Sequence, residues 1–235
     1  NTTGHSNVAI GFSALCTNTT GDKNIAIGHQ SLLSLTTAND NTAVGYNSLR
    51  ANTTGAFNVS VGTSSLQSNT TAEENTAVGY AALQDNTTAA NNTAMGSETM
   101  KATTTGANNS AFGKGALRFN TTGTCNTAVG VSALLANTTG INNVAVGHLA
   151  LDANTEGAKN IAVGQHSLGT VTTGNNNVAV GHIALEDLTT AGNNTAIGAF
   201  SSRNITTGAN NTSIGYDSLA ANTTGADNAA FGSEA

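Results

Sequence analysis

A glycine recurs every 17 residues along the whole chain, and this strict period limits what the chain can fold into. The chain holds fourteen copies, with no insertion or deletion between them. A fold with loops of varying length does not keep such a register. A stack of identical coils must keep it, because one extra residue would shift every later column of side chains. The glycines are Gly11, Gly28, Gly45, Gly62, Gly79, Gly96, Gly113, Gly130, Gly147, Gly164, Gly181, Gly198, Gly215 and Gly232.

Each copy carries the same columns around this glycine, as the stretch 41–49 (NTAVGYNSL) illustrates. Asparagine stands four residues before the glycine in every copy, alanine or serine stands two before it, and an apolar residue stands directly before it. Leucine stands four residues after it, with Met100 and Ser202 as exceptions, and a turn-like Asn-Thr-Thr-Gly follows in many copies. These positions are therefore the ones that every coil needs.

The short run Thr42–Val44 has β-branched residues on either side of a small one, between asparagine and glycine, which indicates a strand. A repeat of 17 residues with two glycines in most copies is too short and too glycine-rich for helices. The sequence predicts an all-β fold without helices. The expected form is a parallel β-solenoid or β-roll of about fourteen 17-residue coils, in one continuous array over 1–235. Each coil is expected to hold two short strands and two tight corners.

Each column has a predicted structural role. The asparagines are expected to form a ladder of side-chain amides at a corner, and the glycines to supply positive φ or close backbone approach at a turn. Two apolar columns are expected to fill the thin interior, so that Val129→Asp would disorder neighbouring coils. Representative residues are Asn41, Asn75, Asn126 and Asn211 for the ladder; Gly45, Gly79, Gly130 and Gly215 for the turn; and Val44, Leu49, Val78, Leu83, Val129 and Leu134 for the core.

The column of Ala43 points to the strand face opposite Val44, and its small size in every copy leaves two explanations open. Either the coil is tightly pressed at that point, or another chain lies against it. Two large apolar side chains per coil are few against the entropy of ordering seventeen residues. Association with further copies of the chain is therefore expected, as a homotrimer or an end-to-end filament.

Composition excludes several partners. Charged residues make up 9% of the chain and its formal net charge is −6, with seven Lys and Arg, so no basic surface for nucleic acid is expected. No apolar run is long enough to span a bilayer, and no signal peptide is visible. Because neither end carries an atypical repeat, the chain is expected to be a segment of a longer fibre.

The residues Asn-Val-Ala-Ile-Gly (7–11), Asn-Ile-Ala-Ile-Gly (24–28) and Asn-Thr-Ala-Val-Gly (41–45) resemble the repeats in the heads of trimeric autotransporter adhesins. The longer unit 41–55 is also similar to Asn-Thr-Ala-Val-Gly-Tyr arrays of phage tail fibres and bacterial surface proteins. The resemblance covers the whole chain and implies a left-handed parallel β-roll that assembles as a homotrimer. It departs from the adhesin heads in its longer period and in the spacing from asparagine to glycine.

Residues that could carry chemistry are dispersed. His29, His148 and His182 share the column after the glycine, and surface histidine is the favoured interpretation over a zinc site. Cys16 and Cys125 lie more than six coils apart, too far for a disulfide within one solenoid, so free thiols are expected. No cofactor or metal site is predicted. Asn-Thr-Thr, as at 69–71, matches the glycosylation pattern, but turn formation is the stronger interpretation. Ice binding is disfavoured because adjacent threonines point to opposite sides of a strand.

Uniform repetition without a single polar cluster favours a non-enzymatic function. The leading hypothesis is an extracellular structural or adhesive fibre segment, such as a surface adhesin shaft or a secreted filament subunit. The alternative is a tail-fibre segment of a phage or virus that recognises host surface glycans. In either case the outward positions Tyr46, Tyr80 and Tyr216 are the candidate recognition residues, and the location is extracellular, at the cell surface or on a virion. A solenoid enzyme ranks a distant third.

Overall fold

The computed structural model describes residues 2–235, which fold into two compact units, one ending at Thr122 and the other spanning Gly123–Ala235. Every element in the described residues is a three-residue strand, and none is a helix, as predicted. The first unit holds β1 (Val8–Ile10), β2 (Ile25–Ile27), β3 (Thr42–Val44), β4 (Val59–Val61), β5 (Thr76–Val78), β6 (Thr93–Met95) and β7 (Ser110–Phe112). The second unit holds β8 (Thr127–Val129), β9 (Val144–Val146), β10 (Ile161–Val163), β11 (Val178–Val180), β12 (Thr195–Ile197), β13 (Thr212–Ile214) and β14 (Ala229–Phe231).

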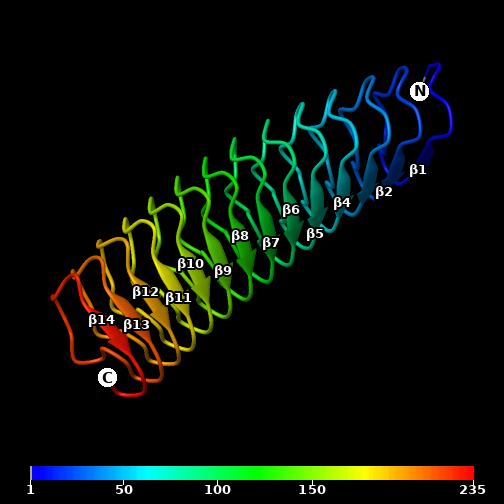
Figure 1. Cartoon of the computed structure of the whole chain (residues 1–235). Coiled ribbons are helices and arrows are strands. Elements are labelled where there is room, and N and C mark those ends of the chain that lie inside the picture. Colours follow the sequence, from blue (N-terminus) through cyan, green and yellow to red (C-terminus); the bar gives the residue numbers. More distant parts are fainter. Residues whose placement is uncertain (1) are drawn as a thin grey trace. The chain divides into compact units, whose positions relative to one another are not determined.

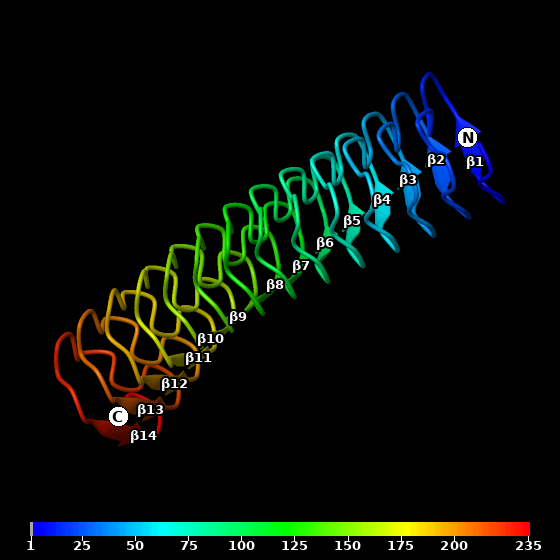
Figure 2. The same cartoon turned by 90° about the horizontal axis from the view of Figure 1, so that it is seen from above.

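Within each unit, consecutive strands pair in parallel, in chain order. Each residue lies opposite its equivalent 17 positions later, as in Ala43 opposite Ser60 and Ala145 opposite Ala162. The strands of a unit therefore lie side by side along one side of its coils (Figure 1), as the second view also shows (Figure 2). The prediction of a parallel β-solenoid with a 17-residue period is confirmed, whereas the hand of the coil stays a prediction.

The strands turn their small central residue inward, and one part of the predicted core is wrong. Ala43, Ala77 and Ala128 are fully buried within this single chain, so their close neighbours belong to the same chain. The apolar residue after them points outward: Val129 is 38% exposed, and Val44 and Val78 are only partly buried. The expectation that Val129→Asp would disorder neighbouring coils assumed that this valine points inward. Because it points outward, the structure gives no reason to expect that effect.

The physical reason is the thinness of the coil. The leucine column is fully buried as predicted, at Leu49, Leu83 and Leu134, and it lies in the same interior as the strand alanines. Alternate residues of a strand point to opposite faces, so either the alanine column or the valine column of the strand can face the interior, but not both. A leucine opposite the strand leaves room for alanine or serine and not for a second large side chain.

Each coil contains one strand, so the expected second strand is wrong. The leucines stand in the left-handed region, with φ of 50° at Leu49 and Leu83 and 53° at Leu134, where an extended strand is impossible. This conformation costs about 1–2 kcal/mol for a residue with a side chain. A backbone bond to the next coil holds it in place, as from the N–H of Leu49 to the carbonyl of Ser65 at 3.0 Å.

The glycine after each strand makes the predicted turn. Its φ is 138° at Gly45, 137° at Gly79, 135° at Gly130 and 136° at Gly215, a region that residues with side chains rarely adopt. A side chain at Gly45 would also collide with the carbonyl of Gly62 in the next coil. The column therefore admits no other residue for two independent reasons, conformation and space.

Candidate functional site

The asparagines four residues before each glycine, hereafter the inter-coil column, form the predicted ladder. The side-chain oxygen of Asn41 accepts the backbone N–H of Asn58 at 3.1 Å, and its amide nitrogen donates to the carbonyl of Gly55 at 3.0 Å. The same two bonds recur elsewhere: Asn75 accepts from Asn92 and donates to Ala89, Asn126 accepts from Asn143 and donates to Gly140, and Asn211 accepts from Asn228 and donates to Gly225. Each of these residues thus satisfies backbone groups of the next coil.

A second column of buried residues stands seven residues after the glycine, and sequence reasoning treated its members only as turn residues. In this turn column, Asn52, Asn69 and Asn86 form a further amide ladder, with 3.0 Å and 2.8 Å between successive amide groups. Each also closes its own turn, as the amide nitrogen of Asn52 does by donating to the carbonyl of Gly55 at 2.8 Å. The regular spacing of Asn-Thr-Thr was the signal that could have revealed the column.

The turn column also bears on whether Asn-Thr-Thr is a glycosylation site or a structural turn. Asn18, Asn69, Asn86 and Asn120 are almost fully buried, so their amide groups are not available for a glycan. The first threonine of the motif also has a structural role: after Asn69, the hydroxyl of Thr70 donates to the carbonyl of Thr87 at 3.0 Å. Both observations favour the structural interpretation of this motif over a modification site.

The residues after the glycine point outward, as predicted for the candidate recognition residues. Tyr46, Tyr80 and Tyr216 are 51%, 58% and 53% exposed. In the first unit, the ring of His29 stacks between Phe12 and Tyr46, with centroids 5.3 Å and 5.1 Å away. Rings stacked along the coils offer their edges to solvent, because their faces contact each other. A role of these tyrosines in recognition stays a prediction.

The second unit gathers three titratable side chains on its surface. The rings of His148 and His166 meet edge to face at 5.9 Å, and Asp152 lies in their field. Partial burial raises the pKa of Asp152 above its ordinary value of 3.8, while a hydrogen bond and the two histidines act in the opposite direction. No group of three or more metal-ligating side chains could hold a metal ion anywhere in residues 2–235.

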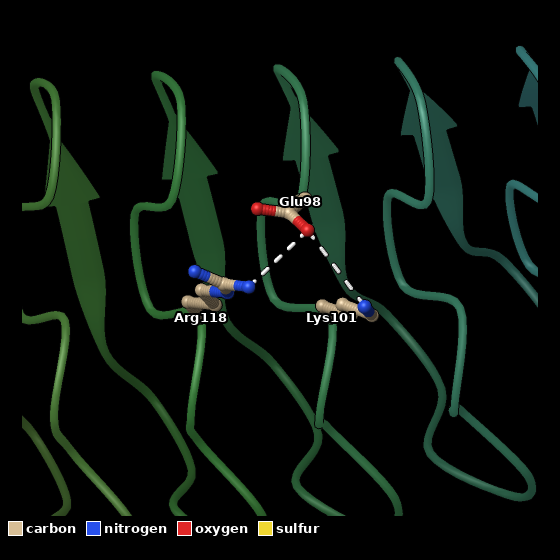
Figure 3. A network of polar contacts seen from close by, with 3 residues as sticks. All are labelled: Glu98, Lys101 and Arg118. Atoms are coloured by element: carbon tan, nitrogen blue, oxygen red, sulfur yellow. Dashed lines mark hydrogen bonds and ion pairs between the residues drawn. The ribbon is translucent and has the colours of Figure 1, made fainter.

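A network of ion pairs lies on the first unit. The carboxylate of Glu98 contacts the guanidinium of Arg118 at 3.2 Å and the ammonium of Lys101 at 3.7 Å, from two neighbouring coils (Figure 3). All three side chains remain partly exposed to solvent. Exposed pairs of this kind contribute about 0–1 kcal/mol each, so the network is a modest clamp between coils.

Cys16 and Cys125 are exposed free thiols, which confirms the expectation that they are not bridged. Among residues 2–235 there is no helix with the length and apolar character needed to cross a membrane. Searches against protein-family models, curated protein sequences and solved structures found no match to this chain.

Proposed function

We propose that this chain is a segment of a non-enzymatic extracellular fibre, either a surface adhesin shaft or a secreted filament subunit. One observation carries the proposal: within each unit, every strand pairs with the next at the same 17-residue offset. Such a chain extends by adding identical coils, and a function that depends on stacking needs the residues that the coils share.

The extracellular location is supported by the repeat itself. Its Asn-Thr-Ala-Val-Gly units resemble the heads of trimeric autotransporter adhesins and the arrays of phage tail fibres and bacterial surface proteins. The low content of charged residues also fits a protein whose side chains serve mainly to stack coils, since the asparagine, glycine and leucine columns are uncharged.

Electron microscopy of the native material tests the fibre function. Thin rods or filaments on cells, in the medium or on virions are expected. Compact particles with no elongated form would contradict the proposal. The matched sample is the Gly79→Ala variant, prepared in the same way. Its rods should be shorter or disordered, because the substitution disrupts the turn after one strand.

A second candidate function, recognition of surface glycans, is favoured by one observation. Tyr80 is 58% exposed, and its neighbours in the column, Thr63 and Ser97, have small side chains. Its ring faces are therefore open to a sugar in a way that the stacked ring of Tyr46 is not. If this function holds, Tyr80→Ala should abolish binding in a glycan array, whereas the control Thr63→Ala should retain it.

A further inference from the structure

The outward side of the strands forms one apolar surface in each unit, hereafter the outer sheet face. It consists of the first and third residues of every strand. The third residue is apolar in all fourteen strands, and the first is Val, Ile, Ala, Thr or Ser. Members at least 36% exposed include Ile25, Val59, Val61, Met95 and Phe112 in the first unit and Val129, Ile161, Val180, Ile197 and Ile214 in the second.

This face carries no charge. The chain has seven Lys and Arg and thirteen Asp and Glu, and every one of these twenty residues stands in another column. The column just after the glycine, only two positions from the face, does accept charge, for example at Lys114. A solvated β-surface normally alternates apolar residues inside with polar residues outside. The absence of charge is therefore a property of this face and not of the exposed surface in general.

The area of the face matches an interface between proteins. Each unit presents two outward residues on each of seven strands. At roughly 50 Å² apiece, these give about 700 Å² per unit. Monomeric soluble proteins rarely expose contiguous apolar patches above a few hundred Å², and a standard interface covers about 800 Å² on each partner. One unit alone approaches this size, and both units carry the face.

We propose that the outer sheet face binds the same face of a second copy of this chain, forming a two-fold dimer with two sheets packed about 10 Å apart. Each coil has one strand, so each unit has one such face, and a face that binds its like on another copy closes with two copies. A glycan is a poor occupant, because its hydroxyl groups would meet a surface without charged or amide side chains. The inference rests on the proposed fibre function, which it refines to a fibre two chains thick.

The test compares two double variants with one change in each unit. Val61→Lys/Val129→Lys places a charge on the face twice. The matched control Thr63→Lys/Val131→Lys places the same charges two residues away in the same coils, where Val131 is 47% exposed, comparable with 38% for Val129. All four side chains point to solvent in the single chain, so both variants should keep the far-UV circular dichroism of the wild type.

Light scattering with size exclusion then reports the mass. The wild type and the control should elute at twice 23.3 kDa, and the face variant at 23.3 kDa. Its dimer dissociation constant should rise by on the order of 100-fold or more, because an unpaired charge is buried on each partner. If the lysine variant fails to fold, Val61→Thr/Val129→Thr provides the test, since threonine occurs on this face at Thr42 and Thr76. It should weaken the dimer by about tenfold.

Three results would overturn the inference: a monomeric wild type at micromolar concentration, a mass of three chains, or equal dimerisation of the face variant and its control. None of these would remove the fibre function, which electron microscopy decides separately. Fibres one chain thick would refute the dimer and keep the fibre. Discrete dimers that never elongate would refute the fibre and keep the dimer.

Discussion

The two asparagine columns respond differently to substitution within the chain itself. The inter-coil column is asparagine in all fourteen coils. The turn column also holds other residues, all of them fully buried: Leu35, Thr103, Val171, Leu188 and Ile205. The backbone of the turn is the same in both cases: the N–H of Leu35 donates to Leu32, and that of Asn52 donates to Leu49, each at 3.3 Å. Leucine thus fills a space that an amide otherwise fills.

The difference lies in whose backbone groups the side chain satisfies. Asn75 accepts the N–H of Asn92 and donates to Ala89, which are groups of the next coil. In the turn column, the amide nitrogen of Asn52 donates to Gly55 in its own turn, and its oxygen accepts from Asn69, the side chain of the same column. Asn52 can be replaced because the carbonyl of Gly55 keeps a second donor, the amide of Asn41, and because the oxygen of Asn52 serves a side chain. The inter-coil column cannot be replaced in this way, because its oxygens accept backbone N–H groups.

The largest effect is expected from Asn75→Leu. The substitution removes the acceptor for the N–H of Asn92 and the donor to Ala89, in a buried position. The N–H of Asn92 is left unsatisfied, whereas the carbonyl of Ala89 keeps the amide of Asn86 as a second donor. One buried unsatisfied group and two lost hydrogen bonds should lower the free energy of unfolding by roughly 3–5 kcal/mol, measured by denaturant titration. A loss below about 1 kcal/mol would mean that the inter-coil column is as replaceable as the turn column.

The second largest effect is expected in the glycine that follows each strand, compared with the glycine of the Asn-Thr-Thr-Gly turn. Gly79→Ala requires φ of 137° with a side chain and a collision with the backbone of Gly96, so about 3 kcal/mol should be lost. Gly55→Ala is the comparison: its Cβ would also meet the carbonyl of Ala72, but Gly55 is not among the glycines with positive φ. Alanine already stands in that second column at Ala72, so only the steric part of the loss is expected there. Thermal unfolding of the two variants should differ clearly, and equal midpoints would show that the turn after the strand is adaptable.

Leu188→Asn should have a smaller effect. The new amide would lie between Val171 and Ile205, which offer no side-chain partner for a ladder. A buried amide with incomplete hydrogen bonds should cost about 2 kcal/mol in denaturant titration. Leu188→Met is the control of similar volume. A neutral result for the asparagine would indicate that the local turn bond alone satisfies it.

Asn69→Leu should cost about 1–2 kcal/mol, because only side-chain amides lose a ladder partner. The oxygen of Asn52 loses its donor, and Asn86 loses one acceptor while keeping its 3.0 Å bond to the carbonyl of Ala89. The measurement is again the free energy of unfolding, made beside Asn75→Leu. If Asn69→Leu proves as damaging as Asn75→Leu, the distinction between the columns fails.

The smallest effect is expected outside both columns, at Asp152. Partial burial raises its pKa in the folded protein, so the folded state binds the proton more tightly than the unfolded chain. Stability should therefore decline slightly as the pH rises from 3.8 through the raised value, and Asp152→Asn should flatten that slope. A slope of opposite sign would show that the attraction of His166 and His148 outweighs burial.

Most of the fold follows from the period. Fourteen glycines at equal spacing predict the stacked coils, and the invariant asparagines predict their ladder. The strand orientation could not be taken from hydrophobicity, because Val44 is larger and more apolar than Ala43, yet Ala43 is inside. The better signal was steric: a column that is small in every copy reports a limit on space. The left-handed leucines carry no sequence signal, because neighbouring coils impose their conformation.

The hydrogen bonds between coils also decide how such a chain would respond to pulling. Each coil is attached to the next by bonds that run along the direction of stacking, as between Leu49 and Ser65, so a tensile load on the chain ends falls on one junction at a time. Detachment of a single coil would release 17 residues, or roughly 55 Å of extended chain. Coils joined in this way would absorb mechanical work in many equal steps before the last of them detaches.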